Sequence, residues 1–216
     1  MSAKANREYR NMTIEIQKAE ADGDDRKMVR GYASTFDEPY TLIDNEELRI
    51  DEVVDSSAFE TTDMSDVIMQ YDHKGRVFAR KSNDTLFVTA DERGLLIEAD
   101  LGGTEIGRQL YEEIEGGYTN KMSFGFTVDG LERTRIKSED GRPHILRRIT
   151  SVKKLYDVSA VSVPANDATS LSVRSLLDGE IEIIQAERLE EEKLALERRR
   201  AEIKAKALSI GGKSNE

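Results

Sequence analysis

Apolar and polar residues alternate along much of the chain, which is the pattern of half-buried β-strands. The clearest case is residues 121–128, KMSFGFTV, where every second residue is apolar (Met122, Phe124, Phe126 and Val128). Ser123 and Gly125 fall on the opposite face. Because glycine within a strand often marks a place where another backbone or a ligand comes close, Ser123 is a candidate nucleophile with room beside it. A simpler interpretation, in which Ser123 is only the polar side of an amphipathic strand, remains open.

The N-terminal part of the chain predicts a β-hairpin. Alternating residues between Tyr9 and Ala19 indicate one strand, and residues 28–36 indicate a second. Asp22-Gly23-Asp24-Asp25 lies between them and has the composition of a turn. Because the two strands are close in sequence, we expect them to pair with each other.

Two further apolar strands carry polar residues that could take part in catalysis. Residues 67–71, VIMQY, lead directly into Asp72 and His73, and residues 155–163, LYDVSAVSV, contain Asp157. A carboxylate in a core-like strand needs a partner, because an unpaired buried charge is very unfavourable. Either an imidazole N–H or an arginine in a structural ion pair would serve. His73 is likewise either a general base or an ordinary surface histidine.

Two helices are expected. In residues 104–115 an apolar stripe recurs every four residues, Thr104 is a suitable N-cap, and Gly116-Gly117 supplies a C-terminal stop. From about Glu180 to Leu208 the chain is rich in Glu, Lys, Arg, Ala and Leu and contains no Gly or Pro, which predicts a long charged helix.

The long helix carries only half of a coiled-coil pattern. Leu189, Leu196 and Ile203 recur at seven-residue spacing, but the companion row contains lysine and arginine. The segment is therefore either a solvated single helix or one that binds a partner or self-associates.

Many short strands with few helices predict a β-rich α+β fold with a barrel-like main domain. We expect a flexible N-terminal arm over residues 1–8, a main domain over residues 9–175, and a charged helical tail over residues 176–216.

Composition restricts the classes of function. The chain has 43 acidic and 32 basic residues and a formal net charge of −11, which argues against a nucleic-acid partner. The absence of cysteine excludes disulfides, a thiol nucleophile and thiolate metal ligands, and it suits a reducing cytosol. No apolar run is long enough to span a bilayer, so we expect a soluble, intracellular protein with no membrane partner.

Metal and cofactor chemistry is not expected. A zinc site needs at least three protein ligands, and the chain has only two histidines, His73 and His144, and no cysteine. The glycine pairs at 102–103 and 116–117 lack the spacing of a phosphate-binding loop.

Five segments, taken in order, resemble the prohead (capsid-maturation) serine proteases of tailed phages, which are related to the herpesvirus assemblin-type proteases. They are GYASTF at 31–36, DH at 72–73, DERGL at 91–95, MSFGF at 122–126 and DVSAVSVPAN at 157–166. The resemblance spans roughly residues 10 to 175. It implies a herpesvirus-protease-like fold, that is, a closed β-barrel flanked by helices.

The resemblance also implies a catalytic triad. Ser123 would be the nucleophile and His73 the general base, with Asp157 in the third position, where the herpesvirus relatives have a second histidine. Backbone N–H groups near Ala165 and Asn166 would donate to the oxyanion. This assignment agrees with the requirement for a hydroxyl, a base, and a group that orients the base.

The function implied is that of a serine endopeptidase of phage or prophage origin. It would process the major capsid protein or its scaffold segment, and itself, inside the immature capsid (prohead) in the host cytoplasm, with self-association as a further option. The alternative is a non-enzymatic capsid scaffold or assembly protein in which Ser123 is inert. A hydrolase that uses the same triad on a small ester is a third candidate.

Overall fold

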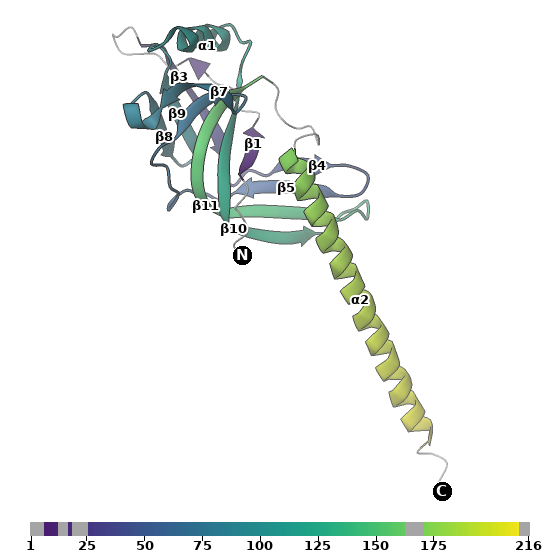
Figure 1. The fold of residues 1–216 in the computed structure, drawn as a ribbon. Helices are drawn as coiled ribbons and strands as arrows, with labels where there is room; N and C mark the ends of the chain where they lie inside the picture. Colours follow the sequence, from purple (N-terminus) through teal and green to yellow (C-terminus); the bar gives the residue numbers. More distant parts are fainter. Residues whose placement is uncertain (1–6, 13–16, 19–25, 163–170, 212–216) are drawn as a thin grey trace. The chain divides into compact units, whose positions relative to one another are not determined.

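The computed structural model describes residues 7–12, 17–18, 26–162 and 171–211 (Figure 1). The chain divides into two compact units, residues 1–172 and 173–216, and we describe each by itself. Within the described residues, the first unit is rich in strands and carries helix α1 (Glu105–Glu115), whereas helix α2 (Leu171–Gly211) makes up the second. The predicted β-rich α+β class with a long C-terminal helix is thus confirmed.

The strands of the first unit form two sheets. The larger has the order β1 (Glu8–Met12), β10 (Lys121–Ile136), β11 (His144–Val161), β5 (Arg49–Val54), β4 (Tyr40–Asp44), and β6 (Ile68–Tyr71) and β7 (Lys74–Arg80) branch from it at β11. The smaller has the order β2 (Gln17–Lys18), β3 (Met28–Thr35), β9 (Gly94–Asp100), β8 (Leu86–Ala90). The short 3₁₀ helix η1 (Lys81–Asn83) links β7 to β8.

The predicted closed β-barrel is not found among the described residues, because both sheets are open. The reason lies in β11, which pairs with β10 along one edge and with two parallel partners along the other. Residues 144–149 pair with β5, and residues 157–160 pair with β6. The larger sheet therefore forks at β11 instead of closing on itself.

Strand β10 lies in the centre of the core at its N-terminal end. The apolar side chains of Met122, Phe124 and Phe126 are buried, as the alternation predicts, and the rings of Phe124 and Phe126 stack with centroids 4.5 Å apart. The opposite face is buried as well, since Ser123 is 0% exposed and Thr127 is 2% exposed. The strand is thus enclosed on both faces around Ser123, and not half-exposed.

Helix α1 begins and ends where the sequence predicts. The Thr104 hydroxyl accepts a hydrogen bond from the Gly107 N–H at 3.0 Å, and Gly117 after the helix has a φ of 74°. Leu110 and Ile114 from the predicted stripe are buried in the main core, with Tyr111 beside them.

The predicted N-terminal hairpin is only partly correct. Strand β2 pairs antiparallel with β3, with Gln17 opposite Arg30. Strand β1, however, pairs with β10, which lies more than a hundred residues further along the chain. Residues 13–16 and 19–25, including the predicted acidic turn, lie outside the described residues.

Helix α2 is a continuous helix that begins earlier than predicted, at Leu171. Leu189, Leu196 and Ile203 are 58%, 50% and 60% exposed, so this apolar row has no cover within the described residues. Neither α1 nor α2 is long and apolar enough to cross a membrane over the part that the structure describes.

Candidate active site

The turn between β6 and β7 has an unusual backbone conformation. Asp72 and His73 have φ values of 48° and 57°, in the left-handed region, where non-glycine residues are uncommon but Asp and His are enriched. The Asp72 N–H donates to the Ala160 carbonyl at 2.9 Å, and the Asp72 carboxylate accepts from the Ser162 N–H and hydroxyl. These bonds to the end of β11 and to Ser162 just beyond it hold the turn so that the imidazole faces β10 and β11.

The structure brings the three predicted triad residues together. His73 Nε2 lies 2.6 Å from Ser123 Oγ, and His73 Nδ1 is hydrogen-bonded with Asp157 Oδ1. Ser123 lies on β10 and Asp157 on the neighbouring β11. A hydroxyl, an imidazole and a carboxylate are therefore linked in series across three adjoining parts of the larger sheet.

Ser159 is a fourth member of this network that the sequence analysis did not identify. Its hydroxyl accepts from the His73 backbone N–H at 3.2 Å and lies 3.1 Å from Asp157 Oδ1 and 3.2 Å from His73 Nδ1. Ser159 is 0% exposed and faces Ser123 across the β10–β11 ladder. It therefore contacts both the backbone of the histidine and the carboxylate behind its ring.

Gly125 lies directly opposite Asp157 in the same ladder. A Cβ at this position would overlap Asp157 Oδ2 and would lie 2.8 Å from Tyr9 Cε1 and 3.1 Å from Arg7 Nε. The room that a glycine leaves beside Ser123 is thus filled by the carboxylate and by side chains of the N-terminal segment.

That N-terminal segment contacts each of the three residues. The Ser123 hydroxyl donates to the Arg10 carbonyl at 2.6 Å, and the Tyr9 ring centroid is 4.4 Å from that of His73. Arg7 Nη2 forms an ion pair with Asp157 Oδ2. The two partners considered for Asp157, an imidazole and an arginine, are therefore both present.

The site is enclosed. Ser123 and Asp157 are 0% exposed, and the His73 side chain is 13% exposed. In this conformation the hydroxyl of Ser123 is covered by the backbone of Arg10.

Arg10 is fixed by a buried ion pair. Its guanidinium bonds Glu52, which is 0% exposed and also accepts from the Tyr40 hydroxyl at 2.6 Å. Burial alone would raise the pKa of the Glu52 carboxyl, but the attraction and hydrogen bonds of Arg10, with a contribution from Arg147, outweigh it and hold that pKa below its usual value. Glu52 is thus an ionised carboxylate within the core.

His144, the other histidine, belongs to a different cluster. Its Nε2 lies 2.7 Å from Asp51 Oδ2, and Asp51 also bonds Arg49 and Thr41. The structure therefore does not join His144 to the Ser123 network.

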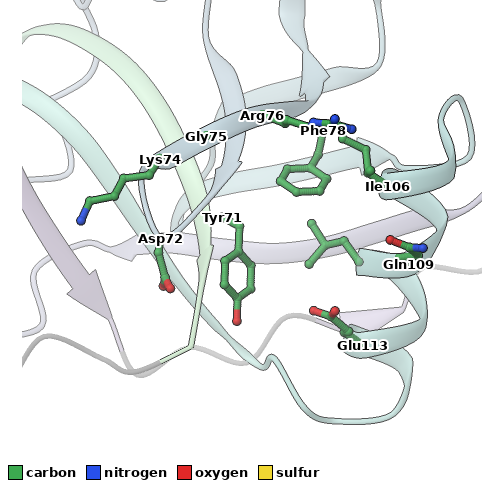
Figure 2. Close-up of a pocket in the computed structure, with 10 residues that line it drawn as sticks. Tyr71, Asp72, Lys74, Gly75, Arg76, Phe78, Ile106, Gln109 and Glu113 are labelled. Carbon is green, nitrogen blue, oxygen red and sulfur yellow. The ribbon is translucent and has the colours of Figure 1, made fainter.

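A pocket of about 600 Å³ adjoins the His73 turn, between the β6–β7 hairpin and helix α1. Figure 2 shows the rings of Tyr71 and Phe78 on one side and Ile106, Gln109 and Glu113 of α1 on the other. Asp72 and Lys74, which flank His73 in sequence, also line it. The pocket thus offers an apolar wall with a charged rim next to the candidate site.

Two further points of the sequence analysis concern metal ligands and the oxyanion donors. Among the described residues no group of three or more histidines, aspartates and glutamates is placed to hold a metal ion. Ala165 and Asn166, the predicted neighbours of the oxyanion donors, lie outside the described residues.

A serine, a histidine and an aspartate joined in this order form the type of site that serine peptidases use. A sequence model for the caudovirus prohead serine proteases matches residues 12–180, well over half of the chain, and the protein belongs to this family. The match contains His73, Ser123 and Asp157 and begins after Arg7, Tyr9 and Arg10. No curated protein and no solved structure matches the chain.

Proposed function

We propose that the protein is a serine endopeptidase of capsid maturation, with Ser123 as nucleophile, His73 as general base and Asp157 as the residue that orients the imidazole. The observation that carries this proposal is the hydrogen-bonded series Asp157–His73–Ser123 in a member of a serine peptidase family. The nucleophile has a base within hydrogen-bonding distance, and the base has a carboxylate that can orient it.

In this mechanism His73 Nε2 takes the Ser123 proton while Oγ attacks the peptide carbonyl carbon. The imidazolium then gives that proton to the leaving amine, and an acyl-enzyme remains on Ser123. A water molecule, deprotonated by His73 in the same way, releases the acid. Asp157 stabilises the imidazolium and accepts a hydrogen bond from Nδ1–H, which keeps the neutral imidazole in the tautomer whose Nε2 is free to accept a proton. The backbone N–H groups proposed for the oxyanion are those near Ala165 and Asn166, which follow β11 in sequence.

The substrates proposed are the scaffold, the scaffold-like segment of the major capsid protein, and the protease itself, cleaved inside the prohead within the host cell. The support is membership of the prohead protease family. The rival, a non-enzymatic assembly protein, has one observation in its favour, since Ser123 is 0% exposed.

Co-expression with the capsid protein distinguishes the peptidase from the non-enzymatic assembly protein. Wild type and a Ser65→Ala control, which changes an exposed serine, are expected to give the same cleaved capsid-protein bands. Ser123→Ala is expected to leave the capsid protein intact. Identical band patterns for wild type and Ser123→Ala would remove the peptidase proposal, and mapping the new peptide termini would separate a peptidase from a small-ester hydrolase.

For the tail, residues 176–216, we propose a role in binding the scaffold and retaining the protease in the prohead. The exposed row Leu189, Leu196 and Ile203 offers an apolar stripe on an otherwise charged helix. A variant that lacks residues 176–216 is expected to be lost from purified proheads. Its incorporation at the wild-type level would contradict this role.

A further inference from the structure

We infer that the edge of β10 beside Ser123 is a binding surface for an extended peptide with a basic side chain, and that the protein's own residues 7–12 occupy this surface in the resting state. The inference rests on the proposed function, because it concerns access to the same serine. It follows from the contacts of β1, a strand that the sequence pattern assigned to a hairpin.

The first step is that one short strand engages every member of the triad. The Arg10 carbonyl accepts from Ser123, the Tyr9 ring lies against His73, and Arg7 pairs with Asp157. The Arg7 guanidinium carbon also lies 4.5 Å from the centroid of the Tyr156 ring. Substrate cannot reach Ser123 while these contacts persist.

The second step concerns the single proton of the Ser123 hydroxyl. His73 Nε2 and the Arg10 carbonyl oxygen both lie 2.6 Å from Oγ. A hydroxyl donates one hydrogen bond at a time, so when it donates to Arg10 it does not donate to the base that has to remove its proton. The β1-bound state is therefore an inactive one.

The third step is that another extended segment could replace β1, because β1 lies at the edge of the sheet. Among the described strands β1 lies at the edge of the larger sheet and pairs only with β10, from Glu8 opposite Phe126 to Met12 opposite Met122. Figure 1 shows it as a short strand beside the long β10–β11 pair. When β1 leaves, the exposed N–H and C=O groups of β10 can pair with another extended segment by strand addition.

The fourth step gives the chemistry of the incoming peptide. Arg10 is 3% exposed and neutralises Glu52, which is 0% exposed. If β1 left and nothing replaced that guanidinium, the carboxylate would lose its main partner inside the core and keep Arg147, at 3.3 Å, and the Tyr40 hydroxyl, which is unfavourable for a buried charge. A peptide with arginine or lysine at the register of Arg10 would restore the pair. The surface should therefore select a basic side chain at that position.

The test measures how fast a fluorophosphonate probe modifies Ser123 in the full-length protein. An Arg7→Ala/Tyr9→Ala variant weakens β1 but keeps Arg10 with Glu52, and Asp157 keeps His73 and Ser159 as partners. Tyr32→Ala/Arg93→Ala is the matched control, because it removes a comparable arginine–tyrosine contact, with Arg93 over the Tyr32 ring, from the smaller sheet. A second variant, lacking residues 1–9, removes the same contacts without introducing alanines, so it shows whether an effect of the double variant comes from the lost contacts.

Labelling about tenfold faster in both N-terminal variants than in the control and wild type is the expected result, because a larger fraction of molecules would be open. Equal or slower labelling, with wild type still labelled at Ser123, would overturn the inhibitory strand and leave the peptidase proposal intact. No labelling of Ser123 in any folded variant would instead overturn the peptidase proposal.

The preference for a basic side chain is tested with the hexapeptide REYRNM, residues 7–12, added to a further variant that lacks residues 1–12, so that the chain's own Arg10 does not occupy Glu52. The peptide, and a version with Arg10→Lys, should slow labelling, whereas the version with Arg10→Ala should be at least about tenfold weaker. Equal protection by all three peptides would overturn the assignment of Glu52 as the selecting group.

Discussion

Gly125 and Asp157 face each other across β10 and β11, and the carboxylate of Asp157 fills the space that any side chain at position 125 would need. The position of the Asp157 carboxylate therefore requires a glycine at 125. In the proposed mechanism this glycine acts on Ser123 only indirectly, through the carboxylate that would orient His73.

Replacing Gly125 with alanine should displace the carboxylate from His73. We expect the rate of peptide cleavage to fall about a hundredfold, the loss that a misplacement of about 1 Å produces at a reacting centre, and the protein to lose about 1–3 kcal/mol of stability from overpacking. Gly103→Ala is the control, because a Cβ there meets nothing within 4 Å. Cleavage kinetics and urea unfolding of both variants check this, and a fully active Gly125→Ala protein would contradict it.

Asp157→Asn tests the role of the carboxylate with almost no change of shape. An amide in this position favours the wrong imidazole tautomer, so we expect a fall of about 10⁴-fold in kcat. The control is Asp66→Asn, which changes a partly exposed aspartate that pairs with Arg80. A loss of less than about tenfold in single-turnover kinetics would mean that the carboxylate does not orient the base.

Ser159 should act as a positioning residue. Removing its hydroxyl in Ser159→Ala takes one hydrogen bond from the His73 N–H and a contact from Asp157, and we expect kcat to fall about tenfold with little change in KM. The pH dependence of kcat should shift too, because the imidazole environment changes, and Ser159→Thr should restore much of the rate. A change in KM alone would assign Ser159 to substrate binding.

Glu52 links stability to pH. Its pKa is lower in the folded protein than the usual 4.5, so its ionised form stabilises the fold above about pH 4.5, and this contribution is lost as the pH falls through the folded pKa. At pH 7 we expect Glu52→Gln to be less stable than wild type by about 3 kcal/mol, because Arg10 would lose its buried counter-charge, although it would keep its ion pair with Glu8.

The difference between wild type and Glu52→Gln should shrink below pH 4.5, as measured by urea unfolding at several pH values. Glu47→Gln, at an exposed position, should track wild type throughout. If the difference in unfolding free energy between wild type and Glu52→Gln stays constant down to low pH, Glu52 is not ionised in the folded protein.

Local signals in the sequence predicted the parts of the fold that depend on nearby residues. Thr104 and Gly117 delimit α1 because capping involves backbone groups within one turn. The positions of Ser123, His73 and Asp157 at or within apolar strands, together with the family resemblance, were enough to select them. Their proximity could not be read from spacing, because it depends on which strands pair.

Non-local pairing is also why other features were missed. Strand β1 looks like half of a hairpin because the alternation from Tyr9 to Ala19 reads as one strand followed closely by β3. Its pairing with β10 instead joins residues such as Tyr9 and Gly125, which no local pattern connects. Ser159 looks like an ordinary polar residue of an alternating strand. Whether a barrel closes depends on the pairing of all its strands. The fork at β11 therefore cannot be predicted from the sequence of any single strand.

The connectivity of the site has a consequence for the time at which the protein can first act. Ser123 bonds a histidine 50 residues before it, and that histidine bonds an aspartate 84 residues further on. Strand β11, which supplies Asp157 and Ser159 and holds the His73 turn, is the last strand of the sheet to be synthesised. The Ser123–His73–Asp157 series therefore cannot form on the ribosome until β11 has emerged and folded back. If this series is the catalytic site, as proposed, no cleavage can begin until nearly the whole β-rich unit has been translated.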